Sequence, residues 1–242
     1  MKKWAVKQAN EIIVNKIKFY FEETLGLTEA QVNDLLQDAY YQKYTEEANI
    51  ITEQLDYQNK LYFVLRGCVL VKTYQPDGNF SCELYAEKEY FPETLEQDER
   101  FFGQQDAIAC KDTVILFLSL KKITKLAVTN PSVMNYFYHS FVQRQLMLRD
   151  LEYACSRGKC NKRVSVILDL FARNCGQALQ NGDILLPKPL THLVLESYIK
   201  SGHTIVCIVL KELRQKGFLK TNTKRLILDG KNLSEFKKML SA

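Results

Sequence analysis

The sequence predicts an α+β protein made of three successive parts, and three observations lead to that fold class. Between residues 61 and 120, short runs rich in β-branched and aromatic residues alternate with turn signals, which is typical of a small antiparallel barrel or roll. An uninterrupted helical pattern follows from residue 131 to about residue 156. The C-terminal part then reads as a helix, a tight turn, a second helix and a small hairpin.

Size and composition are those of an ordinary globular protein. The chain has 242 residues, of which 46% are hydrophobic, and its 13 Tyr and 13 Phe can fill real cores, so disorder is not expected. The net charge of +5 is compatible with a nucleic-acid partner without being diagnostic of one.

The lack of a recognisable signal peptide and the cysteine usage predict a cytoplasmic protein with no membrane partner. Mixed polar residues follow the N-terminal Met-Lys-Lys, and the longest apolar run, Val114 to Leu118, is far too short to span a bilayer. The seven Cys form no regular framework, which predicts reduced thiols.

The N-terminal half shows two helices before the strands. We expect helices at Glu11–Phe21 and Thr28–Tyr40, the second with Thr28 as its N-cap. The turn signal Pro76–Asn79 should join two strands as a hairpin, because Gly78 accepts positive φ at no steric cost. The expected strands are Leu61–Leu65, Cys68–Tyr74, Phe80–Tyr85 and Thr113–Leu120.

The long helix from Pro131 to about Ser156 carries a heptad-like seam interrupted by Arg144. Packing on its own barrel is one interpretation. We favour two buried faces, one against the barrel and one against a second copy, because a second apolar face is also present. The predicted homodimer interface consists of Met134, Phe137, Phe141, Leu148 and Leu151, and the second face of Tyr138, Val142 and Leu146.

A basic run follows this helix and precedes the C-terminal part. It is either a solvated hinge or a contact to phosphates. Its residues are Arg157, Lys159, Lys162 and Arg163, and after them we expect a helix at Val164–Phe171, a turn at Asn181–Asp183 and a short strand at Ile184–Leu186.

The two C-terminal helices have the order and spacing of a winged helix-turn-helix. Thr191 and Ser201 can cap the first and second helix, and Gly217 can end the second. The inward residues are Leu195, Tyr198 and Ile199 on the first helix and Val206, Val209, Leu210 and Leu213 on the second, and the wing carries Lys220, Lys224 and Arg225.

A helix-turn-helix normally reads double-stranded DNA with the outward residues at the start of its second helix. The predicted DNA-binding residues are Ser201, Gly202, His203, Thr204, Cys207 and Ile208, with Lys211, Lys224 and Arg225 placed for phosphates.

With these motifs, the chain resembles the Crp/Fnr family of bacterial transcription regulators over nearly its whole length. The matching segments are Leu61–Val71, Asp77-Gly78, Ile123–Pro131, Leu190-Thr191, Val206 and Val209–Leu213. The resemblance implies an N-terminal cyclic-nucleotide-binding-type β-roll (residues 1–130), a long dimerisation helix (131–158) and a C-terminal winged helix-turn-helix (159–242). It also implies a homodimer on a near-palindromic operator, with RNA polymerase and a small-molecule effector as further partners.

The resemblance weakens at the residues that read bases. Family members carry Arg, Glu and Arg where His203, Thr204 and Ile208 align without gaps, so strong bidentate guanine readout is lost. Small residues of the first helix and turn align with Glu196 and Lys200, although a one-residue insertion would seat Ser197 and Gly202 there.

The sensor also departs from the family pattern. Phe91–Leu95 lacks the glycine of the ribose-binding Gly-Glu loop, and Gly103-Gln104 aligns with the phosphate positions, with Arg100 close but displaced. A cyclic phosphate would lack its charge-assisted partner, so we expect no gating by cyclic nucleotides, and the effector-binding residues stay unknown.

Other chemistry finds little support, so we predict no cofactor, metal site or catalytic residue. The cysteine cluster of the iron–sulfur branch is missing, because no Cys precedes Cys68. The three histidines, His139, His192 and His203, show no metal-ligand spacing. A redox switch at Cys155 and Cys160 is an alternative to plain structural thiols.

A rival hypothesis keeps the scaffold and changes the function. Ile205 and Ile208 lie on the outward face of the second helix, where exposed apolar side chains call for a cover. The rival is a signalling or interaction protein that has lost sequence-specific DNA reading.

Overall fold

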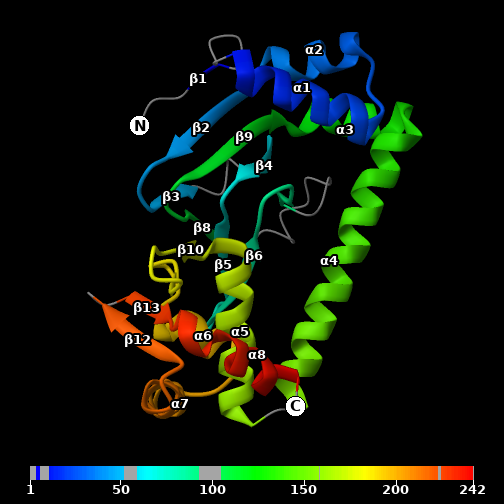
Figure 1. The fold of residues 1–242 in the computed structure, drawn as a ribbon. Coiled ribbons are helices and arrows are strands. Elements are labelled where there is room, and N and C mark those ends of the chain that lie inside the picture. The colour runs from blue at the N-terminus through cyan, green and yellow to red at the C-terminus, as the bar shows by residue number, and fades with distance from the viewer. Residues whose placement is uncertain are drawn as a thin grey trace.

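The computed structural model describes residues 4–5, 11–51, 59–92, 105–157, 159–222 and 225–241. An antiparallel roll covered by the N-terminal helices occupies one end of the molecule (Figure 1). A helical unit with a small sheet occupies the other end, and the helix α4 (Pro131–Arg157) runs along one side of both. The predicted α+β fold class is therefore confirmed.

Two antiparallel sheets form the roll, with the strand orders β1-β2-β9-β4-β7 and β3-β8-β5-β6. The strands are β1 (Trp4–Ala5), β2 (Tyr40–Tyr44), β3 (Ala48–Ile51), β4 (Lys60–Arg66), β5 (Val69–Tyr74), β6 (Phe80–Tyr85), β7 (Tyr90–Phe91), β8 (Gln105–Ala109) and β9 (Thr113–Ser119). The four predicted strands correspond to β4, β5, β6 and β9. The sequence did not reveal β1, β2, β3, β7 and β8, and β8 is held by five register pairs with β5 despite its polar start.

Two glycines fix the turns of the roll. Gly78 has φ +83° in the β5–β6 hairpin, as its turn signal predicts. Gly67 has φ +81°, and a Cβ there would lie 2.6 Å from Oγ1 of Thr113. That hydroxyl donates to the carbonyl of Cys68 at 3.0 Å, so the glycine break lets β9 approach closely.

Three helices cover one face of the first sheet: α1 (Glu11–Leu25), α2 (Glu29–Gln37) and α3 (Leu120–Thr129). Thr28 caps α2 as predicted, in a capping box with Gln31. Phe21, Leu118 and Ile123 are almost fully buried in the core between these helices and the sheet.

The helical unit begins directly after α4. Its elements are α5 (Cys160–Cys175), β10 (Gln177–Ala178), β11 (Ile184–Leu185), α6 (His192–Ile199), α7 (His203–Gln215), β12 (Leu219–Asn222), β13 (Arg225–Leu228), η4 (Gly230–Asn232) and α8 (Leu233–Ser241). The four short strands form one sheet in the order β10-β11-β13-β12. One hydrophobic core joins this unit to the roll, since Leu70 and Leu84 of the roll cluster with Phe171 and Leu195.

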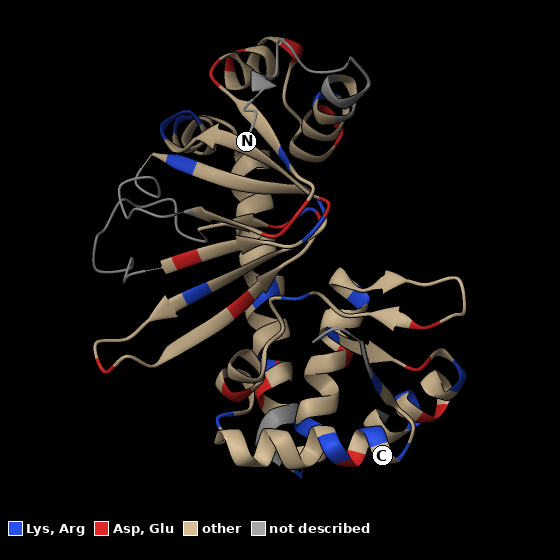
Figure 2. Ribbon diagram, turned by 90° about the vertical axis from the view of Figure 1, so that its left-hand side faces the viewer, with Lys and Arg blue, Asp and Glu red and all other residues tan. Residues whose placement is uncertain are grey.

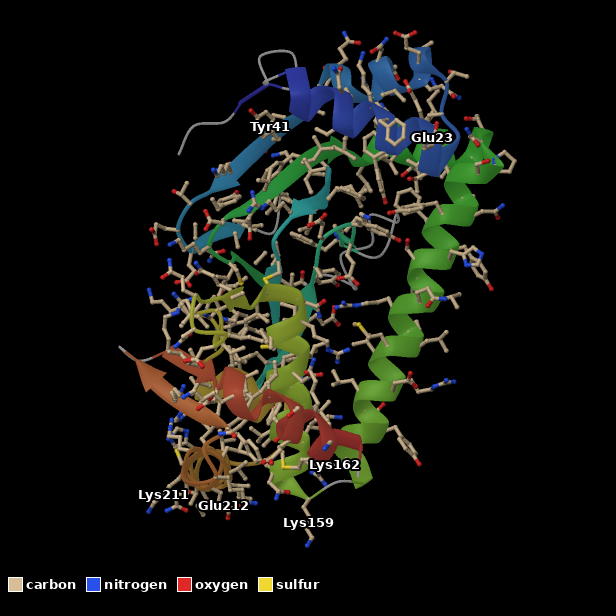
Figure 3. The ribbon with its side chains drawn as sticks, in the orientation of Figure 1. Glu23, Tyr41, Lys159, Lys162, Lys211 and Glu212 are labelled. Carbon is tan, nitrogen blue, oxygen red and sulfur yellow. A yellow bond between two sulfur atoms is a disulfide. The ribbon has the colours of Figure 1, made fainter. Side chains whose placement is uncertain are left out.

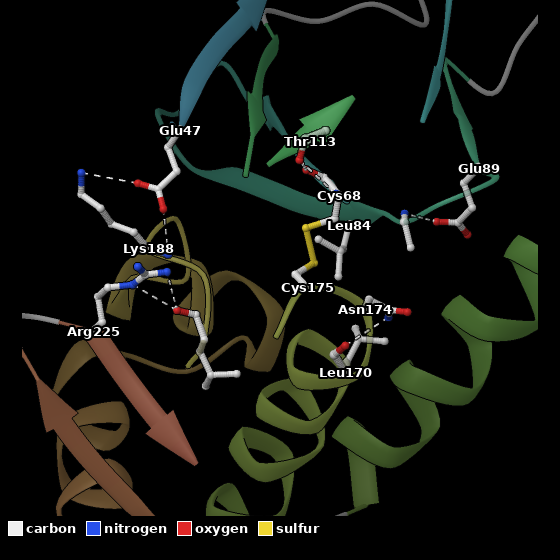
Figure 4. Close-up of a disulfide and its surroundings, with 12 residues drawn as sticks. Glu47, Cys68, Leu84, Glu89, Thr113, Leu170, Asn174, Cys175, Lys188 and Arg225 are labelled. Atoms are coloured by element: carbon white, nitrogen blue, oxygen red, sulfur yellow. Dashed lines mark hydrogen bonds and ion pairs between the residues drawn. A yellow bond between two sulfur atoms is a disulfide. The ribbon is translucent and has the colours of Figure 1, made fainter. Parts of the chain in front are cut away.

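A disulfide also joins the two units (Figure 4). Cys68, between β4 and β5, is bonded to Cys175 at the end of α5. The expectation that all thiols are reduced is therefore wrong for this pair. The sequence could not indicate the pairing, because the two residues are 107 positions apart.

Within the described residues, no single helix has the length and composition to cross a membrane. The pair α6 and α7 would pass by composition together, but it is bent by 107°.

Candidate nucleic-acid interface

The helices α6 and α7 form a helix-turn-helix at the end of the molecule farthest from α1 and α2 (Figure 1). The hydroxyl of Thr191 caps α6 by accepting from the amide of Val194, as predicted. Lys200 ends α6 in the left-handed region, at φ +49°. The 107° between the two helices lies in the range that DNA-binding helix-turn-helix motifs use.

The start of α7 differs from the expectation. Gly202, not Ser201, occupies the N-cap, and its carbonyl accepts from the amides of Ile205 and Val206. The predicted Ser201 cap is therefore wrong, because the backbone turns into the helix one residue later. The end of α7 is as predicted, with Gly217 at φ +74° just after the C-cap Lys216.

The predicted inward residues of α7 all lie in the core. Val206, Val209, Leu210 and Leu213 are each less than 5% exposed. On the opposite face His203, Thr204, Ile208 and Lys211 are exposed, whereas Ser201 and Cys207 are half-buried. The first two turns of α7 carry no Lys, Arg, Asp or Glu, and its charged residues begin at Lys211 (Figure 2).

The predicted phosphate-binding cations have different surroundings. Lys211 lies on the outer surface next to Glu212 (Figure 3). Arg225 is half-buried, and its guanidinium donates to the carbonyl of Leu186 at 3.1 and 3.3 Å. Lys224 lies outside the described residues.

The third wing cation, Lys220, serves the fold. Its ammonium lies 3.0 Å from the carboxylates of both Asp183 and Asp229. The amide of Gly230 and then Lys220 hold the pKa of Asp183 below its usual value, and Lys220 does the same for the pKa of Asp229. This charge triad ties β12 to the loops before β11 and after β13.

Four side chains with metal-binding chemistry meet at the helix-turn-helix, and the sequence pattern did not predict this cluster. Nδ1 of His203 lies 2.6 Å from Oε1 of Glu196, and its Nε2 lies 3.4 Å from Sγ of Cys207. Nδ1 of His192 is 3.6 Å from the same sulfur. Burial, and then the charge of His203, lowers the pKa of His192. The prediction that these histidines show no metal-ligand spacing is therefore wrong, because the turn brings His192 of α6 next to His203 and Cys207 of α7.

The predicted seam of α4 divides between two environments. Phe137 is 7% exposed and packs edge-on against Tyr90 of the roll at 4.8 Å. Met134 and Phe141 are 46% and 45% exposed, and Leu148 and Leu151 are half-buried. Phe137 therefore belongs to the core of its own chain.

Arg144 also points into the roll, which explains the polar interruption of the seam. Its guanidinium lies over the ring of Tyr85 at 4.2 Å and donates to the carbonyl of Leu84 at 2.6 Å. It forms ion pairs with Glu83 and Glu89, each at 3.6 Å. A groove of about 480 Å³ lies beside this cluster, between α4 and the strands β6 and β7.

Most of the segments weighed as a cyclic-nucleotide site lie outside the described residues. These include Arg100, Gly103-Gln104 and the second half of Phe91–Leu95. The side chain of Cys155, part of the redox alternative, is also outside them, and Cys160 is a half-buried free thiol.

Comparisons with known proteins agree on the fold. No family model matches the chain. A protein of Porphyra purpurea named as an HTH-type transcriptional regulator, ycf28, is 21% identical over 193 residues, which are 79% of this chain and 80% of that protein. A transcriptional regulator of the crp/fnr family from Eubacterium rectale superposes with a TM-score of 0.69 at 16% identity, over 93% of this chain and 100% of the other. FixK2 from Bradyrhizobium japonicum superposes with a TM-score of 0.63 at 18% identity, over 84% and 98%. The resemblance noted in the sequence is thus confirmed, and the chain has the fold of the Crp/Fnr transcription regulators.

Proposed function

We propose that this protein is a DNA-binding transcription regulator that acts as a homodimer on a near-palindromic operator. The observation that carries the proposal is the start of α7, where Thr204 and Ile208 are exposed while Val206 and Leu210 are fully buried. A helix held in this way presents its first turns to a DNA major groove. Thr204 can hydrogen-bond a base edge, and Ile208 can contact a thymine methyl group.

Cations near the same end of the molecule support binding to phosphates. Lys211 is exposed on α7, and Lys159 lies at the start of α5 (Figure 3). Lys200 lies in the turn after α6. Such residues add affinity for any sequence, because each neutralised phosphate releases a counterion. Base contacts and phosphate contacts therefore make separable contributions.

The exposed apolar face of α4 supports the homodimer. Met134, Tyr138 and Phe141 lie within three helical turns on one side of the helix and are each at least 45% exposed. Two copies that pair through this face would present two α7 helices related by a twofold axis. That symmetry is what a near-palindromic operator requires.

The test compares two variants on genomic promoter fragments by fluorescence anisotropy over a salt series. Thr204→Ala should weaken operator binding by about 1–3 kcal/mol and leave random DNA unaffected. Lys211→Ala should weaken both DNAs alike and reduce the salt slope by about one counterion. Lys121→Ala, at an exposed site on α3, is the control. Equal effects of Thr204→Ala on both DNAs would contradict base reading by α7.

Exposed apolar residues favour a second candidate function. Leu193 on α6 is 58% exposed, and Ile205 and Ile208 on α7 are 40% and 53% exposed. A protein partner would cover such a surface. Failure to bind any genomic fragment at low salt would favour this interaction protein.

The expectations for effectors belong to the same proposal. Cyclic AMP and cyclic GMP should give no saturable heat in calorimetry, because the sequence lacks the phosphate-binding Arg and the ribose-binding glycine. Saturable binding with a micromolar dissociation constant would contradict that expectation. A different small-molecule effector and RNA polymerase stay predicted partners.

A further inference from the structure

Three potential metal-ligand atoms converge at the helix-turn-helix. They are Nδ1 of His192, Nε2 of His203 and Sγ of Cys207, and all lie within 4.8 Å of one another. His192 and His203 are the first residues of α6 and α7. Cys207 lies four residues after His203, on the same face of α7, so the bend between the helices brings the three side chains together.

The spacing of the ligand atoms suits a tetrahedral zinc ion. With Zn–S of about 2.3 Å and Zn–N of about 2.0–2.1 Å, two ligands at the tetrahedral angle are separated by roughly 3.5 Å from sulfur to nitrogen. The two observed separations from Sγ of Cys207 are 3.4 and 3.6 Å. Both sulfur–nitrogen distances already match this value in the structure, so the three side chains need little rearrangement to bind an ion.

Hydrogen bonds and a bound cation are two alternative ways in which this cluster can be satisfied. The 2.6 Å contact with Glu196 places the proton of His203 on Nδ1, which leaves the lone pair of Nε2 directed at Cys207. The thiol of Cys207 can donate its one proton to that lone pair, and its sulfur can accept from Nδ1–H of His192, so the hydrogen-bonded form requires one defined tautomer of each ring. A cation between the sulfur and the two nitrogens would use all three lone pairs at once.

Glu196 adds the outer partner that metal-bound histidines usually have. A ligating imidazole commonly donates its other N–H to a carboxylate, which fixes the ring and raises its basicity. Glu196 lies on α6 and its side chain is 19% exposed, so it approaches His203 from the neighbouring helix. Both helices therefore contribute to the site.

We propose that the helix-turn-helix binds one zinc ion through Nδ1 of His192, Nε2 of His203 and Sγ of Cys207, with the fourth position open to water or another ligand. Nitrogen and sulfur ligands select zinc and similar transition metals over magnesium and calcium. Binding releases the thiol proton of Cys207, because the thiolate is the ligand.

The site overlaps the predicted base-reading surface, a consequence that rests on the DNA-binding function proposed above. His203 and Cys207 are two of the predicted DNA contacts, and a bound ion would hold both against α6. Zinc would also fix the angle between α6 and α7. The metal should therefore change operator affinity, and the metal site itself can be tested without DNA.

Cobalt(II) titration of the chelator-treated full chain tests the metal site. We expect one equivalent to give the visible bands of tetrahedral cobalt and a near-ultraviolet sulfur-to-cobalt band, and zinc to displace it. Cys207→Ser should abolish the sulfur-to-cobalt band. Glu196→Gln should keep the stoichiometry and lower affinity by about 10- to 100-fold. Absence of the bands in the wild-type chain, or their persistence in Cys207→Ser, would overturn the proposal.

Matched controls come from the chain itself. His139→Ala removes the remaining histidine, which is exposed on α4, and Cys160→Ser removes a half-buried free thiol, so neither should change the titration. Cys110→Ser tests the second group of sulfur atoms, Cys68, Cys110 and Cys175, which also lie within 4.8 Å of one another. Loss of the bands in Cys110→Ser with retention in Cys207→Ser would assign the metal to that group and overturn the proposal.

A measurement on the unmodified protein guards against a variant that fails to fold. Zinc should slow the alkylation of Cys207 by iodoacetamide at least tenfold, as read by peptide mapping, while Cys160 reacts at the same rate with and without zinc. Equal rates at Cys207 would contradict the proposal. Operator binding with and without zinc is measured separately. A cobalt-binding chain that binds no DNA would refute the proposed function and leave the metal site standing, whereas DNA binding without cobalt bands would do the reverse.

Discussion

The two sides of α4 carry similar residues in very different surroundings. On the side that faces the roll, Phe137 and Arg144 are 7% and 6% exposed and contact Tyr90 and Tyr85. Beside it, on the outward flank of the helix, Tyr138 and Phe141 are 65% and 45% exposed, and Phe141 also lines the groove between α4 and the roll. The first side belongs to the core of this chain, and the second is an exposed apolar surface of the kind that another protein covers.

This difference shows what a seven-residue pattern can and cannot indicate. Phe137 and Phe141 are one step of four apart, so both fall in the same predicted seam. The pattern finds apolar positions of a helix and does not say which neighbour covers each. In the structure Phe137 packs on Tyr90 and is 7% exposed, whereas Phe141 only lines the groove beside the roll and is 45% exposed.

Charges on the exposed side should have the largest effect. The double change Tyr138→Glu and Phe141→Glu should give a folded monomer, because unpaired charges buried at a dimer interface cost about 4 kcal/mol or more, roughly a thousandfold in Kd. Sedimentation equilibrium at micromolar concentration measures the mass. Gln143→Glu, exposed on another side of α4, should leave the dimer intact. A wild-type chain that sediments as a monomer would contradict the dimer proposal.

The comparison also explains how far the sequence could predict the site. Thr191 and Gly217 were predicted correctly because caps depend on local backbone geometry. The start of α7 was misplaced by one residue, since Ser201 and Gly202 are both acceptable N-caps. The cluster of His192, His203 and Cys207 was not predicted, because His192 and Cys207 come from separate helices and only the 107° bend places them together.

The roll shows the same limit in its strands. The turn signal that contains Gly78 correctly predicted the β5–β6 hairpin. In contrast, β8 has the mixed sequence Gln105–Ala109 and is defined by its pairing with β5 and β3. Pairing partners decide such a strand more than its own propensity does.

Truncation on the buried side should be almost as costly as charges on the exposed side. Phe137→Ala should lower the free energy of unfolding by about 3–5 kcal/mol, because it removes a buried ring and its edge-on contact with Tyr90. Urea denaturation followed by circular dichroism measures the loss. His139→Ala, exposed two residues further on, should change stability by less than about 0.5 kcal/mol. A loss at Phe137 as small as that at His139 would contradict its assignment to the core.

A polar contact on the buried side should contribute less. Arg144→Met keeps the apolar stem and removes the hydrogen bond to Leu84 and the ion pairs with Glu83 and Glu89. We expect a loss of about 1.5–3 kcal/mol in the free energy of unfolding, the range for hydrogen bonds to charged groups. The dimer should persist, because the exposed side is unchanged. A monomeric Arg144→Met protein would place this residue at the interface.

The smallest expected effect on stability is in the wing, which is held together by charged side chains and not by aromatic packing. The amide of Gly230 and then Lys220 hold the carboxyl pKa of Asp183 below its usual range, and Lys220 lowers the pKa of Asp229. A carboxylate whose pKa is lowered by folding stabilises the native state above its ordinary pKa of 3.8, and that stabilisation is lost as the pH falls through the lowered value. The protein should therefore lose stability between about pH 5 and the acid limit. Lys220→Met should make that loss smaller, as read from urea midpoints at pH 7, 5 and 3, whereas Lys216→Met, exposed at the end of α7, should leave it unchanged. An unchanged acid dependence in Lys220→Met would mean that backbone donors such as the amide of Gly230 suffice to keep these carboxylates ionised.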